Sequence, residues 1–245
     1  MASAPVTSPA CGPSSVSPDA GAGVSTELDG HVDGVHACLV DVYETLLAYD
    51  FETHSREMAA LAGADLKQWQ RAQIAILRDF DAGRLSMDAA VTSILTQCGI
   101  EPGPELVSRI ARADAESLNA GCGLYPDAVP FLRGLRDRGL KIALVSNCGE
   151  DTRPLLTRLD LLGLADVAIL SCEIGHAKPE PEIYHRALTA LGTEAADAVM
   201  IDDQPSYCAG AEAVGVRAIQ VTRNGAPPDP RFRPVGSLLD ILDLL

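Results

Sequence analysis

Apolar residues follow two different periods along this chain, and the change between them separates a helical stretch from a repeat of strands and helices. The continuous apolar run Ala37 to Val42 is typical of a strand that is buried on both faces. From about residue 53 to 119 the apolar positions recur at helical spacing, as in Trp69, Ile74 and Leu77. The pattern therefore predicts one strand followed by an all-helical segment.

After Tyr125-Pro126-Asp127 the pattern changes to alternating strands and helices. The proline suits a first helical turn, so a helix is expected from there to Gly139. We predict strands over 141–146, 167–171, 198–201 and 217–221, and helices near 152–162, 181–191, 205–214 and 237–245. This repeat predicts the α/β class, with a doubly wound parallel sheet and an all-helical domain inserted after its first strand.

The first 34 residues differ from the rest of the chain. They are rich in Pro, Ser, Ala and Gly and have no hydrophobic periodicity, which predicts a disordered tail. The expected organisation is a tail over 1–34, an α/β core over 35–50 and 121–245, and a helical domain over 51–120.

Charge limits the partners of this protein. The formal net charge is −15, and no run of Lys and Arg could follow a phosphate backbone, so we expect no nucleic-acid binding. An acidic surface also repels anions at long range. A small anionic metabolite as substrate would therefore need a locally positive pocket or a bound cation.

Cysteine usage and hydropathy indicate a cytoplasmic protein. The seven cysteines are odd in number and form no C-x-x-C pair, which predicts neither a disulfide framework nor a zinc site. No stretch reaches the roughly twenty apolar residues of a membrane span, and no secretory signal begins the chain. We expect no membrane association, and the sequence leaves the oligomeric state open.

Polar residues stand at or just beyond four predicted strand ends. In a doubly wound sheet these ends meet at one edge, where ligands bind. Each residue by itself fits a simpler role, such as a helix cap or a turn. Together they form a set suited to attack on an anionic electrophile with the help of a metal: Asp41, Ser146, Asn147, Lys178, Asp202 and Asp203.

The segments DVYETL, VSN, HAKPEPEIYHRAL and IDDQPSYCAGAEAVGV resemble the four ordered motifs of the haloacid dehalogenase superfamily. The likeness spans residues 37 to 222, and the helical segment matches the position of that family's cap domain. The resemblance implies a hydrolase in which Asp41 is the nucleophile, Thr45 supports the first loop and Lys178 neutralises charge. It also implies that Ser146 and Asn147 bind substrate oxygens, and that Mg²⁺ is held by Asp41, Asp202, Asp203 and the backbone carbonyl of Tyr43.

The sequence departs from the family's phosphatases at Tyr43, where they place a second Asp that acts as acid and base. A tyrosine, with an ordinary pKa of about 10, is a poor base at neutral pH, although its hydroxyl can still donate a hydrogen bond. Glu44 also replaces the usual Gly and adds a carboxylate near the site.

Metal-free dehalogenases of the family carry Tyr at position 43, and Arg71 could match their anion-binding arginine. A solvent-facing position on an amphipathic helix is the better fit for Arg71, and Trp69 and Tyr49 are expected to be packing residues. One feature argues against the dehalogenase hypothesis. Those enzymes use an Asp to activate water, and this chain has Tyr207 at the aligned position.

Three hypotheses follow. The leading one is a Mg²⁺-dependent phosphatase acting on a small phosphorylated metabolite through Asp41. The alternatives are a 2-haloacid dehalogenase and a non-catalytic relative that keeps the fold but lost turnover through Tyr43.

Overall fold

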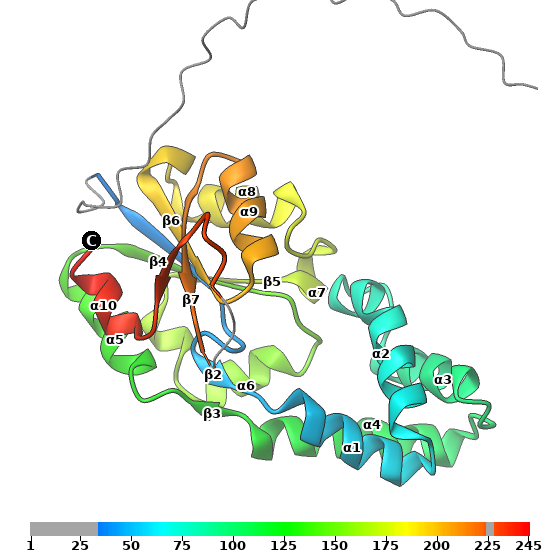
Figure 1. Ribbon diagram of the computed structural model, residues 1–245. Helices are drawn as coiled ribbons and strands as arrows, with labels where there is room; N and C mark the ends of the chain where they lie inside the picture. Colours follow the sequence, from blue (N-terminus) through cyan, green and yellow to red (C-terminus); the bar gives the residue numbers. More distant parts are fainter. Residues whose placement is uncertain (1–33, 224–227) are drawn as a thin grey trace, which may run out of the picture. The chain divides into compact units, whose positions relative to one another are not determined.

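A six-stranded sheet forms the centre of the computed structural model, which describes residues 34–223 and 228–245 (Figure 1). The strand order is β5-β4-β1-β6-β7-β8, and every neighbouring pair is parallel. The strands are β1 (Ala37–Val40), β4 (Lys141–Ser146), β5 (Val167–Leu170), β6 (Ala198–Asp202), β7 (Arg217–Val221) and β8 (Arg233–Val235). The predicted α/β class with a doubly wound parallel sheet is confirmed. The tail predicted over 1–34 lies outside the described residues except for Gly34.

The first strand lies in the middle of the sheet because both of its faces are apolar. Cys38 and Val40 point into one core cluster, while Ala37 and Leu39 point into the other, as the two-residue period of a strand requires. Strand order reverses on either side of β1, which pairs with β4 and with β6. This is the switch point at which α/β sheets bind ligands.

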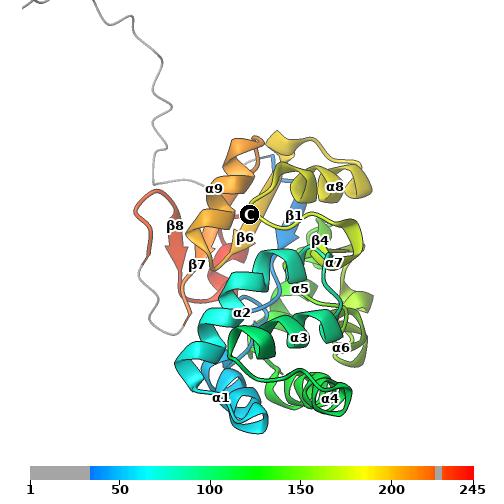
Figure 2. The same ribbon diagram turned by 90° about the vertical axis from the view of Figure 1, so that its right-hand side faces the viewer.

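Helices cover both faces of the sheet. Leucine and phenylalanine side chains of α5 (Ala128–Asp137), α6 (Thr152–Arg158) and α10 (Leu238–Leu242) pack into the first cluster. Side chains of α8 (Pro181–Leu191) and α9 (Pro205–Ala213) pack into the second, and these two helices lie side by side (Figure 2). The short helix α7 (Ser171–Ile174) and 3-10 turns over Leu162–Leu164 and Ala195–Asp197 complete the connections.

Four helices follow the first strand, in the stretch where the sequence predicted the all-helical domain. They are α1 (Phe51–Ala62), α2 (Leu66–Asp81), α3 (Met87–Gln97) and α4 (Pro104–Gly121), and we call residues 51–121 the helical insertion (Figure 1). Side-chain oxygens of Asp50, Asp65 and Ser86 cap the first three helices. A separate apolar cluster, centred on the buried Trp69, holds the four helices together. The assignment of this insertion as a separate domain remains a prediction.

The helical insertion contacts the rest of the protein at several places. An antiparallel pair, β2 (Leu47–Ala48) and β3 (Gly123–Leu124), joins the chain where it enters and leaves the insertion. At another place, Gly83 lies so close to α7 that a Cβ on it would fall 2.2 Å from the Cys172 carbonyl oxygen. Glycine is required there both by this approach and by its positive φ.

Two expectations from the pattern need correction. Ile74 was assigned to the apolar face of its helix, but 66% of it is exposed, because α2 turns a different stripe inward. The helix predicted over 152–162 ends at Arg158, and Asp160 has a left-handed φ of 57°. None of the helices in the described part of the chain combines the length and apolar character that a bilayer crossing requires.

Candidate active site

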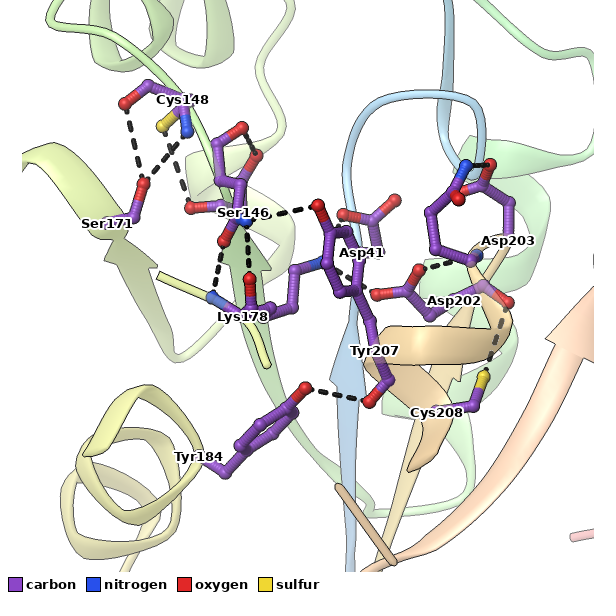
Figure 3. A network of polar contacts seen from close by, with 12 residues as sticks. Asp41, Ser146, Cys148, Ser171, Lys178, Tyr184, Asp202, Asp203, Tyr207 and Cys208 are labelled. Atoms are coloured by element: carbon purple, nitrogen blue, oxygen red, sulfur yellow. Dashed lines mark hydrogen bonds and ion pairs between the residues drawn. The ribbon is translucent and has the colours of Figure 1, made fainter. Parts of the chain in front are cut away.

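Three adjacent parallel strands bring the predicted polar residues to one edge of the sheet. Asp41 directly follows β1, Asn147 directly follows β4, and Asp202 is the last residue of β6. Lys178 reaches the same edge from the loop between α7 and α8 (Figure 3). The structure therefore brings together residues that are up to about 160 positions apart in sequence.

Lys178 is the centre of the charge network. Its Nζ donates hydrogen bonds to Asp41 Oδ1 and to Asp202 Oδ2, both at 2.6 Å, and its side chain is fully buried. Burial by itself would lower the pKa of Lys178, but the charges of Asp202 and Asp41 outweigh it and raise the pKa above its ordinary value. The lysine therefore remains charged and holds the two carboxylates in place.

The second oxygen of Asp41 is free. Asp41 Oδ2 is buried and has no hydrogen-bond partner among the described residues, while Asp41 also lines a cavity. A buried carboxylate oxygen without a hydrogen-bond partner costs free energy in a protein core. It is expected where a ligand or substrate supplies the missing partner. One oxygen of Asp41 is thus oriented by Lys178 and the other is available.

Asp41, Asp202 and Asp203 form a cluster that fits a divalent cation. Each offers a carboxylate oxygen, and these oxygens lie within 4.8 Å of one another. Burial, and then the charge of Asp41, raises the pKa of Asp203 to about 6, while burial raises the pKa of Asp202 despite Lys178. Three carboxylates facing one lysine leave an uncompensated negative charge, and hard oxygen donors are the ligands that Mg²⁺ takes. A fourth ligand from the Tyr43 carbonyl remains a prediction.

Asn147 holds the lysine loop. Its Oδ1 accepts from the Lys178 backbone N–H at 2.7 Å, and its Nδ2 donates to the Lys178 carbonyl at 2.9 Å and to the Tyr207 hydroxyl at 3.3 Å. The Tyr207 ring lies 4.9 Å from Lys178 Nζ. These hydrogen bonds position Lys178. Because Asn147 also lines the cavity, it remains within reach of a ligand.

Ser146 and Thr45 lie near this network but are fully buried, and neither lines the cavity. Ser146 follows the buried apolar run of β4, and the Thr45 hydroxyl has no hydrogen-bond partner among the described residues. The Thr45 carbonyl accepts from Arg223, which ties the first loop to the segment that follows β7. Direct substrate contacts by these two residues remain predictions.

Tyr43 lines the cavity, and its hydroxyl is hydrogen-bonded to another side chain. The phenol lies 2.9 Å from the Thr152 hydroxyl, and burial raises the pKa of Tyr43 above its ordinary value. A phenol with a raised pKa stays protonated at neutral pH and is a weaker acid. Tyr43 can therefore donate a hydrogen bond but is poorly suited to take over the proton transfers of an aspartate.

Glu44 occupies the position where the family motif has Gly, and its φ of 59° explains why glycine suits that place. Its two oxygens are held: Oε1 accepts from the Tyr49 backbone N–H at 2.6 Å, and Oε2 accepts from the Tyr125 hydroxyl at 3.0 Å. Glu44 lines the cavity, where it braces the first loop.

The cavity beside Asp41 has a volume of about 410 Å³ and extends from the strand ends into the helical insertion. Trp69, Gln73, Ile76, Leu77 and Phe80 line it from α2. Their spacing of three and four residues along one helical face was the available signal in the sequence. Trp69 and Tyr49, expected to be packing residues, also line the cavity.

Arg71 is not brought to the site. It is exposed on α2 and is not among the cavity-lining residues. Asp81 at the end of α2, together with His54, Asp114 and Asp151, lines the cavity instead, and none of these four was singled out from the sequence. No motif marks them, since they come from the helical insertion and from a loop after β4.

The sequence profile of the hydrolase family described as haloacid dehalogenase-like matches residues 35–215, which is most of the chain. The chain belongs to this family. Membership of the haloacid dehalogenase-like hydrolase family is what the motifs implied.

Relatives within the family include enzymes of two kinds. A phosphatase of Mycobacterium tuberculosis is 36% identical over 146 residues, which are 59% of this chain and 66% of that protein. An (S)-2-haloacid dehalogenase of Burkholderia cepacia is 27% identical over 231 residues, which are 87% of this chain and 96% of that enzyme. The matched region thus spans just under two thirds of the phosphatase.

A solved structure of a dehalogenase has a TM-score of 0.65 and 25% identity, and the match covers 87% of this chain and 98% of that one. Family membership and fold are therefore settled, whereas the choice between the two reactions rests on the site itself.

Proposed function

We propose that this protein is a Mg²⁺-dependent phosphatase that hydrolyses a small phosphate monoester through Asp41. The observation that carries the proposal is the cluster of Asp41, Asp202 and Asp203, whose oxygens lie within 4.8 Å, beside the free Oδ2 of Asp41. A site built for a carboxylate nucleophile alone has no need of two further carboxylates that burial makes costly. When bound, Mg²⁺ supplies positive charge that offsets the phosphate and the carboxylates.

In this proposal Asp41 Oδ2 attacks the phosphorus atom, and the bond from phosphorus to the alcohol oxygen breaks. Lys178 holds Oδ1 at 2.6 Å and keeps the nucleophile oriented. Water then attacks the phosphorus of the acyl phosphate on Asp41, and the bond from phosphorus to Oδ2 breaks, which releases inorganic phosphate and restores the carboxylate. Asn147 is the proposed contact to substrate oxygens, because it lines the cavity and the buried Ser146 does not.

Proton transfer is the weak point of this site. The departing alcohol needs a proton and the attacking water must lose one, yet the hydroxyl of Tyr43 is held at Thr152 and the oxygens of Glu44 are held by Tyr49 and Tyr125. We therefore expect slow turnover of alkyl phosphates and faster turnover of activated aryl or acyl phosphates, whose leaving groups need less protonation.

The test is a set of phosphate esters and halo-acids assayed with and without Mg²⁺. Phosphate release that requires Mg²⁺ and disappears in Asp41→Asn supports the proposal. A preparation that binds Mg²⁺ but turns over neither substrate class would favour the non-catalytic alternative.

A 2-haloacid dehalogenase is the second candidate. Tyr43 favours it, and so does the similarity to the Burkholderia cepacia enzyme over almost its whole length. A halo-acid carries a carboxylate that needs a cationic partner. No Lys or Arg is among the described residues that line the cavity, and Arg71 lies exposed outside it. Halide release by the wild type without metal, and no phosphate release with it, would reverse the order of the two candidates.

A further inference from the structure

The walls of the cavity differ sharply between the strand ends and the helical insertion. The part nearest Asp41 is polar, whereas the insertion contributes large apolar side chains from all four of its helices. They include Phe51 of α1, Trp69 and Leu77 of α2, Val91 of α3 and Ile110 of α4. Predominantly apolar walls with few polar groups are typical of sites that bind the body of an organic ligand.

Carboxylates dominate the charge of the cavity, and His54, which lies 2.8 Å from Asp114, is the one basic side chain among its described lining residues. Asp41 and Asp203 belong to the proposed metal cluster, and Glu44 is held within the first loop. Three more carboxylates line the remaining space, Asp81, Asp114 and Asp151, and only Asp114 has a charged-type partner, His54 at 2.8 Å.

Three arginines near the cavity form ion pairs with carboxylates that do not line it. Arg153 pairs with Glu173, Arg78 with Glu180, and Arg84 with Asp79. Burial raises the pKa of Asp81 to about 6, with only a partial offset from Lys178, and burial and the charge of Asp114 raise the pKa of Asp151. Both shifts agree with carboxylates that lack a nearby cationic partner.

A substrate with a second negative group would place that group among these carboxylates or against the apolar wall. Either position costs free energy, since like charges repel and an unpaired charge loses its hydration. We propose that the substrate is a phosphate monoester of an apolar, aromatic or branched alcohol that carries no second anionic group. This inference rests on the proposed phosphatase function and names its substrate class.

The test compares matched aryl phosphates with Mg²⁺ present. Phenyl phosphate and 4-carboxyphenyl phosphate differ in one carboxylate, and 1-naphthyl phosphate adds apolar surface. We expect kcat/KM to fall by about tenfold or more from phenyl to carboxyphenyl phosphate and to rise for the naphthyl ester.

Two substitutions on α2 provide a matched pair for the apolar wall. Leu77 lines the cavity and is 43% exposed, whereas Ile74 is 66% exposed and is not among the lining residues. Leu77→Ser should raise KM for 1-naphthyl phosphate by roughly three- to tenfold, because part of a leucine-sized contact is lost. Ile74→Ser should leave it unchanged, and neither substitution opens a buried core.

The possible results separate this inference from the function on which it rests. Equal or higher kcat/KM for carboxyphenyl phosphate, or an equal effect of the two α2 substitutions, would overturn the inference while leaving a phosphatase in place. No phosphate release from any ester would overturn both.

Discussion

The strand ends and the helical insertion contribute to one cavity in opposite ways. At the strand ends, Lys178, Asn147, Asp41 and Asp202 are held by hydrogen bonds of 2.6 to 2.9 Å between groups that burial makes costly to move. The insertion instead presents mainly apolar side chains, and one of its polar lining residues, Asp114, is hydrogen-bonded within the insertion itself, to His54 at 2.8 Å. Chemistry needs atoms placed to within a fraction of an ångström, whereas selection of a substrate body needs mainly shape and charge. Changes at the strand ends should therefore alter the reaction, and changes in the insertion should alter its substrate.

The largest expected effect concerns the nucleophile. Asp41→Asn keeps the shape of the side chain but removes the attacking carboxylate, so phosphate release should fall on the order of a thousandfold or more. Asp137→Asn, at the exposed end of α5, is the control and should retain full activity. Melting curves of both variants establish that the fold is kept. Full activity in Asp41→Asn would place the chemistry elsewhere.

The second-largest expected effect is an increase in catalytic rate. Tyr43→Asp should restore a carboxylate for proton transfer and raise kcat on an alkyl phosphate by on the order of a hundredfold, with a smaller gain on an activated aryl phosphate. Rates on both esters, measured for wild type, Tyr43→Asp and Glu44→Gln, check this. If Glu44 already transfers the proton despite its hydrogen bonds, Tyr43→Asp will gain little and Glu44→Gln will lose activity instead.

The loss of one proposed metal ligand should have a smaller effect than either of these substitutions. Asp203→Asn removes one of three carboxylates facing the proposed Mg²⁺, so calorimetry should record a weakening of about tenfold. Glu182→Gln offers a matched control, because Glu182 lies in a separate surface cluster with His176 and Glu180. Equal effects of the two substitutions would mean that Mg²⁺ is not held at the strand ends.

The smallest effect tests the insertion. Burial raises the pKa of Asp81 from 3.8 to about 6, so the folded state favours the protonated acid. The ionised form costs little at pH 4, and its cost grows as the pH rises and is complete above about pH 6. Asp81→Asn, neutral at every pH, should match wild type near pH 4 and be more stable by about 1 to 2 kcal/mol at pH 8.

Urea unfolding at the two pH values measures this difference. Asp79→Asn is the control, since Asp79 lies on the same helix as Asp81, is exposed and pairs with Arg84 beyond the end of that helix. A gain in Asp81→Asn that is the same at pH 4 and pH 8 would mean that ionisation of Asp81 is not its source.

Most of the sheet could be predicted because its strands are short apolar runs buried on both faces. The bounds of β4, β7 and α8 match the predicted ranges, while β2, β3 and β8 were missed. Strands of two or three residues carry too few positions for a period to appear, and they form only because a neighbouring segment supplies hydrogen bonds.

The sequence by itself determined the family, the parallel sheet and the edge at which the candidate site residues meet, since Asp41, Lys178 and Asp202 stand in ordered motifs at or near strand ends that a parallel sheet must bring together. Only the tertiary structure decided which insertion side chains face Asp41. It turned Leu77 toward the cavity and left Ile74 and Arg71 exposed, and it added Asp81 to the lining. The physical reason is that one helix offers several faces of similar apolar character, and packing against the rest of the protein selects among them.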